Sequence, residues 1–428
     1  MSSLDGPRFR RKSLEDVVDT RAADNAAVRA SQSVELIIFA KIGMEPMVRQ
    51  LLAMRLPKSK ELMVDPNEQT KGDGFTALLV AVQESHHRIV DILLKDPRVD
   101  PNLASAGGST PCFLAGFTGH AATMKCILAS ERVNPNTATP AGHTPLYVAA
   151  GRGHPRCVEL LLADPRVQVN RPTLHGDTPL SIATQEGHVM IIRILLSDAR
   201  VNPNLTSDDG ATPLVVAVQA GSCGTVGALL ACERTDANKP SSFSPPSSSS
   251  SSPPSSSGRR RGGDKEERVE LVTPLCLAVQ LNHLAVLDLL LQHPGCDPLL
   301  DGCGGELPLT MACRKGQTEA VERFLLDPRI KDLNYGGECG TPPLVAAAAH
   351  GRVGVVKALL LAASSALTPL KQLHGGRLPV DLNACDLEGA SAVAMAATEA
   401  AYCFKAAAQN RHSAGGQGSG RGRGGGGK

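Results

Sequence analysis

Residues 176–204 read GDTPLSIATQEGHVMIIRILLSDARVNPN, and this stretch recurs along the chain. Residues 142–170 read GHTPLYVAAGRGHPRCVELLLADPRVQVN, and residues 74–102 read GFTALLVAVQESHHRIVDILLKDPRVDPN. The Thr of the motif falls at Thr76, Thr110, Thr144, Thr178 and Thr212, so successive positions differ by 34 (212 − 178 = 178 − 144 = 34). Self-similarity at such a period indicates a stacked repeat protein.

Each repeat is predicted to contain two short helices and a loop. Thr178 is suited to cap the first helix, because its side-chain oxygen can accept from an unpaired backbone N–H. Pro179 follows at the first helical position, where a missing N–H has no cost. The second helix carries Leu195 and Leu196 on one face. Residues 201–210 are rich in Asn, Asp, Pro and Gly, which predicts a hairpin-like finger loop.

Eight repeats agree at two apolar positions. One helix–turn–helix cannot bury its own apolar face, so such repeats must pack side by side. The first helix always carries an alanine, at Ala81, Ala115, Ala149, Ala183, Ala217, Ala278, Ala312 and Ala347. The second helix carries an apolar pair, at residues 93–94, 127–128, 161–162, 195–196, 229–230, 290–291, 324–325 and 359–360.

This pattern resembles the ankyrin repeat family, whose signature is Thr-Pro-Leu, then Ala, Gly-His and Leu-Leu. The match is specific at residues 144–146 with 153–154, and at 178–180 with 187–188. The family's His after Thr-Pro-Leu is replaced by Tyr147, Ser181 and Val215. The resemblance covers residues 31–405 and implies an all-α ankyrin-repeat solenoid, built from helix–turn–helix and finger-loop units with a 34-residue period.

The predicted organisation has five parts. They are a disordered basic tail at 1–30, an N-terminal cap and repeats one to five at 31–238, a disordered Ser/Pro-rich insert at 239–268, repeats six to eight and a C-terminal cap at 269–408, and a flexible Gly/Arg-rich tail at 409–428.

The insert and two later repeats depart from the regular pattern. The step from Thr212 to Thr273 is 273 − 212 = 61, or 34 plus 27, so the insert replaces a finger tip and leaves the repeat frame intact. Leu307 takes the place of the capping Thr in the seventh repeat, at a predicted cost of about 1 kcal/mol. The eighth repeat carries an extra proline at Pro342.

Composition argues against several classes of protein. The net charge is +2, which gives no bulk electrostatic case for nucleic-acid or membrane binding. No apolar run reaches the roughly 18–20 residues of a membrane span, and residues 1–18 lack the apolar core of a secretory signal. The 12 cysteines contain no Cys-x-x-Cys pair and are interpreted as reduced structural residues. We therefore expect a cytoplasmic protein, with Arg8 to Lys12 as an alternative nuclear-import signal.

The chain contains no His-Glu-x-x-His, no Gly-x-Ser-x-Gly and no phosphate-binding loop, which are short signatures of catalytic sites. Five histidines share one repeat position, and we interpret them as structural turn residues rather than metal ligands. They are His86, His120, His154, His188 and His283. We expect no enzymatic activity, no catalytic residue, no metal and no cofactor.

Protein binding is the better candidate, because ankyrin-like proteins hold partners on a concave face of finger loops and first helices. Two residues after the invariant Ala, four glutamines would form a polar stripe, although descent from a duplicated repeat explains them equally well. Phe117, Tyr147 and Arg314 are candidates because their residue types are enriched at binding hot spots. Leu174 and His175 are candidates because they lie on a finger. The predicted partner-binding residues are Gln83, Phe117, Tyr147, Leu174, His175, Gln185, Gln219, Gln280 and Arg314.

The sequence thus predicts a monomeric, non-catalytic scaffold that binds a protein partner of unknown identity. One alternative is an adaptor that recruits a client to a larger complex, such as a ubiquitin ligase. Another is weak nucleic-acid association through the basic tails, which would disappear with salt and with deletion of residues 1–12 and 411–428.

Overall fold

The computed structural model describes residues 30–54, 64–242, 271–363 and 391. The chain divides into two compact units, an N-terminal unit at Met1–Asn202 and a C-terminal unit at Pro203–Lys428. Four predicted segments lie wholly or mostly outside the described residues. They are residues 1–29 of the predicted tail at 1–30, the tail at 409–428, most of the Ser/Pro-rich insert and almost all of the predicted C-terminal cap.

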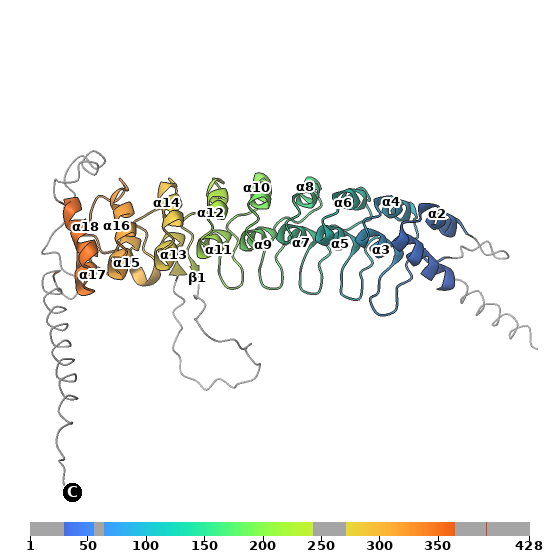
Figure 1. The fold of residues 1–428 in the computed structure, drawn as a ribbon, viewed down its shortest axis with the longest axis horizontal. Helices are drawn as coiled ribbons and strands as arrows, with labels where there is room; N and C mark the ends of the chain where they lie inside the picture. Colours follow the sequence, from blue (N-terminus) through green and yellow to red (C-terminus); the bar gives the residue numbers. More distant parts are fainter. Residues whose placement is uncertain (1–29, 55–63, 243–270, 364–390, 392–428) are drawn as a thin grey trace, which may run out of the picture. The chain divides into compact units, whose positions relative to one another are not determined.

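The described part of the N-terminal unit starts with a helix whose described residues are 30–42, which is paired with α2, and it continues with four further helix pairs. The bounds are α2 Glu45–Ala53, α3 Ala77–Gln83, α4 His87–Lys95, α5 Pro111–Thr118, α6 Ala121–Leu128, α7 Pro145–Gly151, α8 Pro155–Ala163, α9 Pro179–Gln185 and α10 Val189–Ser197. The first helices α3, α5, α7 and α9 form one row and the second helices form another (Figure 1).

The C-terminal unit repeats this arrangement. Its elements are α11 Pro213–Gln219, α12 Cys223–Leu230, β1 Ser241–Ser242, β2 Leu271–Val272, α13 Pro274–Leu281, α14 Leu284–Gln292, the 3-10 turn η1 Cys303–Gly305, α15 Pro308–Lys315, α16 Thr318–Leu325, α17 Pro343–Ala349 and α18 Val353–Ala363. The described residues are thus all-α except for two strands of two residues each, and the all-α solenoid prediction is confirmed.

Threonine caps the first helix in six repeats. The side chain of each accepts a hydrogen bond from the backbone N–H three residues later, which satisfies one unpaired donor of the helix end. These caps are Thr76, Thr110, Thr144, Thr178, Thr212 and Thr273. Helices α15 and α17 begin after Leu307 and Pro342, and neither has a side-chain cap. The predicted loss of the cap at Leu307 is confirmed.

Ser181 takes over the capping role of the family's histidine in one repeat. The Ser181 hydroxyl accepts from the Thr178 N–H at 2.8 Å, while the Thr178 hydroxyl accepts from the Ser181 N–H at 3.2 Å. The two residues therefore satisfy two helix-end donors reciprocally.

The core of each unit consists of thin apolar layers between neighbouring helices. All eight invariant alanines are fully buried, and the first residue of each second-helix pair, such as Leu161, Leu195 and Leu290, is buried as well. A methyl group at the alanine position allows adjacent first helices to approach closely, which explains why no larger residue stands there.

The insert leaves and re-enters the C-terminal unit at one place. Strands β1 and β2 pair antiparallel, with Ser241 opposite Val272. This short ladder closes the base of the finger from which the insert extends, and Thr273 caps α13 directly afterwards.

The helix at 30–42 exposes three large apolar residues, Val34, Ile38 and Ile42. This differs from the polar outer face expected of a terminal cap. In later repeats, apolar side chains of a first helix pack on the preceding first helix: Val148 of α7 lies against Gly116 of α5.

Candidate functional site

The predicted binding residues of the N-terminal unit lie on its first helices and fingers. Gln83, Phe117 and Gln185 are exposed residues near the ends of α3, α5 and α9, and half-buried Tyr147 lies near the start of α7. The row of first helices therefore brings Phe117, Tyr147 and Gln185 onto three helices that pack in succession.

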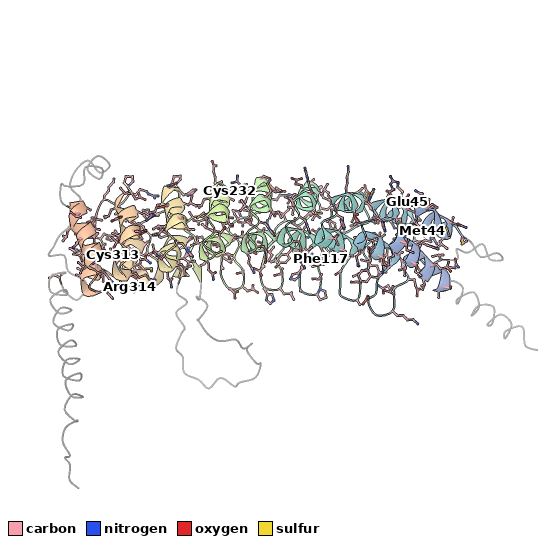
Figure 2. The ribbon with its side chains drawn as sticks, viewed as in Figure 1. Met44, Glu45, Phe117, Cys232, Cys313 and Arg314 are labelled. Carbon is pink, nitrogen blue, oxygen red and sulfur yellow. The ribbon has the colours of Figure 1, made fainter. Side chains whose placement is uncertain are left out.

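Phe117 forms an aromatic surface at the end of α5. Its side chain is 40% exposed, and Figure 2 shows it on the first-helix row. The Arg152 guanidinium carbon lies 4.2 Å from the ring centroid, and the ring of Phe113 stacks with it at 6.5 Å between centroids. A cation over an aromatic face stabilises both groups by about 0.5–1 kcal/mol at exposed sites. Arg152 was missed by the sequence prediction, and it holds Phe117 in place.

Tyr147 is held by a second stacked pair. Its ring lies 4.8 Å from the ring of His143, with an angle of 11° between the planes. Burial raises the pKa of the Tyr147 hydroxyl, and the nearby carboxylates Asp177 and Glu186 raise it further. The phenol is therefore neutral at physiological pH and can donate a hydrogen bond to a partner.

Leu174 and His175 lie at the tip of the finger before α9. Leu174 is 69% exposed, and its backbone N–H donates to the Ala141 carbonyl of the neighbouring finger at 3.4 Å. The His175 N–H donates to the Thr173 hydroxyl at 3.2 Å, which fixes the tip as a tight turn. An exposed leucine on a finger fixed in this way is suited to insert into a partner.

The candidates in the C-terminal unit are more constrained. Arg314 makes a two-point ion pair with Glu306, with donor–acceptor distances of 2.9 and 2.8 Å. Gln219 and Gln280 are half-buried, and the Gln280 carbonyl accepts from the Lys315 ammonium at 2.9 Å. The paired Arg314 side chain therefore has less capacity to bind a partner than its residue type alone suggests.

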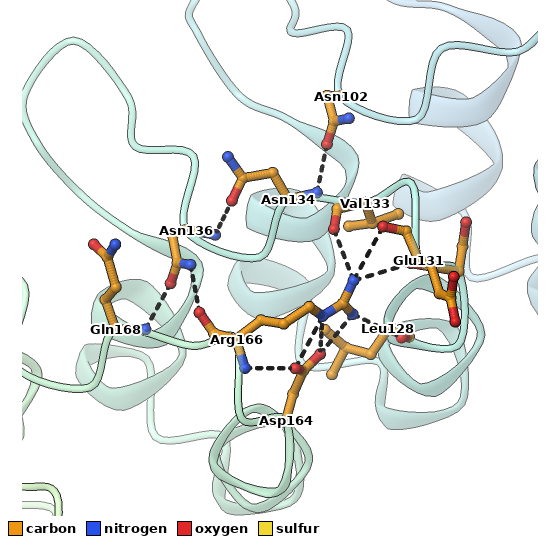
Figure 3. A network of polar contacts seen from close by, with 10 residues as sticks. Asn102, Leu128, Glu131, Val133, Asn134, Asn136, Asp164, Arg166 and Gln168 are labelled. Atoms are coloured by element: carbon orange, nitrogen blue, oxygen red, sulfur yellow. Dashed lines mark hydrogen bonds and ion pairs between the residues drawn. The ribbon is translucent and has the colours of Figure 1, made fainter.

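Asparagine side chains connect successive repeats, which the sequence prediction missed. Asn136 Nδ2 donates to the Arg166 carbonyl at 2.7 Å, and Asn136 Oδ1 accepts from the Gln168 N–H at 2.7 Å (Figure 3). The same two bonds, to residues one repeat ahead, are made by Asn67, Asn102 and Asn170 in the N-terminal unit and by Asn204 and Asn238 in the C-terminal unit. We call these six residues the asparagine ladder.

An arginine caps the second helix of the preceding repeat. The Arg166 guanidinium donates to the Leu128 carbonyl at the end of α6 and to the Val133 carbonyl, at 3.0 and 3.1 Å (Figure 3). Asp164 orients it through bonds of 3.0 and 2.6 Å, and these bonds from Arg166 lower the pKa of the Asp164 carboxyl. Equivalent Asp–Arg pairs are Asp96 with Arg98, Asp198 with Arg200 and Asp327 with Arg329.

Comparison with known protein families agrees with this geometry. The family model described as "Ankyrin repeats (3 copies)" matches residues 97–173, 113–207, 163–241 and 275–368. The model described as "Ankyrin repeat" matches residues 73–106. Together these matches cover more than half of the chain. The chain is an ankyrin repeat protein. No curated protein matches it. Ankyrin repeats are generally protein–protein interaction modules, and ankyrin domains are typically non-catalytic.

The recurring histidines of this ankyrin protein bind neighbouring repeats. The ring Nε2 atoms of His86, His154 and His188 donate to the carbonyls of Lys41, Phe117 and Gly151 in the preceding repeat, at 3.0, 3.2 and 3.1 Å. These bonds hold the starts of α4, α8 and α10 to the end of the first helix of the preceding repeat. The interpretation of these three histidines as structural turn residues is supported by these contacts.

The described part of the ankyrin chain offers little for other chemistry. It contains no group of three or more His, Cys, Asp or Glu side chains placed to hold a metal ion. Its helices also include none that is long and apolar enough to cross a membrane. Cys112, Cys276 and Cys313 are buried in first helices, where a thiol packs as a small apolar group.

Proposed function

We propose that the protein is a non-catalytic interaction scaffold that binds a protein partner on the first helices and fingers of its N-terminal unit. The observation that supports this most strongly is the exposure of Phe117 in the row α3 to α9, whose other large apolar residues are buried or half-buried. Aromatic residues held rigidly at a surface contribute binding energy with little loss of side-chain entropy.

The proposed contact surface consists of Phe117, Tyr147, Gln185 and the Leu174–His175 finger tip. Arg152 and His143 hold the two aromatic rings before a partner arrives, so ordering of these rings costs little on binding. Gln83 extends the surface toward the N-terminus. Gln219, Gln280 and Arg314 belong to the other unit and are proposed as secondary contacts only.

We further propose that the scaffold acts as a monomer in the cytoplasm. Burial of Cys112 and Cys313 in helix positions that other repeats fill with apolar residues supports a reducing compartment. The five-part organisation predicted from the sequence is kept as part of this proposal.

The test is to photo-cross-link the full chain in cell lysate from a reactive residue at Gln185, and then to measure affinity for the purified partner. Phe117→Ala should weaken binding by about 2 kcal/mol, or roughly 30-fold, as expected for a hot spot. Arg156→Ala is the matched control, because Arg156 is exposed on α8 in the other row. Equal affinities of the wild type, Phe117→Ala and Tyr147→Ala variants would refute the proposed surface.

A weaker affinity of both Phe117→Ala and Arg156→Ala would point to a general loss of folding, so the unfolding midpoint of each variant is measured alongside.

Deletion of residues 1–12 and 411–428, with a salt titration, distinguishes binding by the proposed surface from nucleic-acid association through the tails. Scaffold binding should survive both treatments, whereas phosphate contacts by the tails should not.

A further inference from the structure

Two neighbouring fingers of the C-terminal unit expose large apolar side chains. Leu299 and Leu300 lie on the finger at 297–307 and are 39% and 37% exposed, while Tyr335 lies on the finger at 331–341 and is 48% exposed. The corresponding fingers of the N-terminal unit also carry apolar residues such as Leu103, but among their described residues Leu174 is the one large apolar side chain that is exposed. A cluster of exposed apolar residues on a folded protein commonly marks an interaction site.

Leu299 stands where the repeat pattern places a ladder asparagine. The step from Asn238 is 299 − 238 = 61, which is one repeat of 34 plus the 27 that the insert adds. An asparagine at position 299 would bond the groups at 299 + 30 and 299 + 32, namely the Arg329 carbonyl and the Lys331 N–H. The chain therefore gives up two hydrogen bonds between repeats and exposes a leucine. Departures of this kind from a local structural rule occur mainly at functional sites.

The two fingers are joined to one another. The Cys339 N–H donates to the Gly305 carbonyl at 3.1 Å, and the Glu338 N–H donates to Asp301 Oδ2 at 3.3 Å. Leu300 directly precedes Asp301, and Tyr335 lies three positions before Glu338. The two hydrogen bonds therefore fix the backbones of the two fingers to each other at positions close in the sequence to Leu300 and Tyr335.

The region is also acidic. The two fingers carry five carboxylates, at Asp297, Asp301, Glu306, Asp332 and Glu338, against the single cation Lys331. Glu306 is neutralised by Arg314, whereas Asp297, Asp332 and Glu338 are exposed. Asp301 Oδ1 is buried and has no hydrogen-bond partner among the described residues, which adds to the negative potential.

We propose that Leu299, Leu300 and Tyr335 form a second docking surface, for a segment of another protein in which apolar side chains are flanked by lysine or arginine. The apolar anchors would cover the leucines and the tyrosine, and the cations would face the finger carboxylates. This proposal shares with the proposed function only the idea that the protein binds other proteins, because it concerns a different surface in the C-terminal unit. The carboxylates disfavour nucleic acids and anionic membranes, which carry the same charge.

The test uses a phage-displayed library of random dodecapeptides, selected on the immobilised full chain. Enriched peptides should combine apolar residues with lysine or arginine, and their affinity should fall on raising the salt concentration. Leu299→Asn and Tyr335→Ser should each weaken binding by about ten-fold or more, as for interface anchors. The Leu299→Asn variant keeps its fold, because regained ladder bonds offset the partial burial lost, so its unfolding midpoint should not fall.

Phe117→Ala is the matched control in the other unit and should leave these peptides bound. Peptides that lose affinity on Phe117→Ala but not on Leu299→Asn would overturn this inference and leave the proposed function standing. A selection that yields no basic bias, or no peptide sensitive to Leu299→Asn or Tyr335→Ser, would also overturn it.

Discussion

Replacement of Asn136 by alanine tests whether the asparagine ladder stabilises the stack. The change removes the bond to the Arg166 carbonyl and the bond from the Gln168 N–H, both of 2.7 Å. Each such bond contributes about 0.5–1.5 kcal/mol net. Both backbone groups lie at an exposed site where water can replace the lost amide. We therefore expect the free energy of unfolding to fall by about 1–2 kcal/mol. This loss is smaller than the one expected if the two backbone groups were buried and left without a hydrogen-bond partner.

Two measurements on the full chain check this value. Urea denaturation gives the change in stability, and native-state hydrogen exchange reports on the Gln168 backbone amide, whose protection should drop in Asn136→Ala. Gln168→Ala is the matched control, because it keeps the backbone N–H that Asn136 accepts from, and it should change stability by only a few tenths of a kcal/mol.

A stabilising role for the asparagine ladder is ruled out if Asn136→Ala and Gln168→Ala are equally stable and the amide at position 168 exchanges at the same rate in both. That result would mean that water replaces the asparagine side chain without loss, and that apolar packing alone holds adjacent repeats together.

Three further predictions concern residues outside the asparagine ladder. Asp164 has a lowered pKa in the folded state, so its contribution to stability is present above its unfolded pKa of about 3.9 and is lost as the pH falls through the folded value. Asp164→Asn should therefore be less stable than the wild type at pH 7 and nearly as stable near pH 2, measured by urea unfolding. Leu307→Thr should lower stability by about 1 kcal/mol, because the buried leucine contributes about 1.5–3 kcal/mol and the regained cap only about 1 kcal/mol; a higher urea midpoint would contradict this. In the native chain at pH 8, iodoacetamide should modify exposed Cys223 and spare Cys112, whose pKa burial raises to about 12, as read by peptide mass spectrometry.

The fold could be predicted because its signals are local and repeated. Thr178-Pro179 marks the start of a helix without reference to the rest of the chain, and an alanine at the same place in every repeat marks the packed face. The loss of the side-chain cap at Leu307 could also be predicted, because leucine has no oxygen that could accept the hydrogen bond. The structure adds that Leu307 is buried, so apolar contact replaces the missing hydrogen bond.

The asparagine ladder could not be predicted with the same ease. Asn102, Asn136 and Asn170 do recur at the repeat spacing, but asparagine in a loop is already explained by its turn preference. Its partners are backbone atoms of the next repeat, and sequence letters carry no information about them. The arginine caps were missed for the same reason.

The surroundings of the candidate binding residues could be predicted only in part. Residue type and repeat position predict Phe117 as a binding residue on a first helix. They do not predict that Arg152 lies over its ring, because that contact depends on the direction of both side chains. Residue type alone suggests Arg314 as a binding residue, whereas its pairing with Glu306 depends on how the finger folds back on α15. Leu299 was overlooked because leucine in a helical repeat protein is ordinarily assigned to the core.

The ladder around the insert shows how such a chain can change its length. Asn136 reaches groups 30 and 32 positions ahead, whereas Asn238 reaches Gly295 and Asp297, 57 and 59 positions ahead, with the same pair of bonds. The difference, 57 − 30 = 27, equals the extra length of the insert. Each ladder asparagine bonds only to the next repeat. After duplication or deletion of one whole repeat, the asparagines on either side could therefore form the same pair of bonds with their new neighbours. Gene segments of this kind can therefore vary in copy number without the need for a compensating substitution elsewhere.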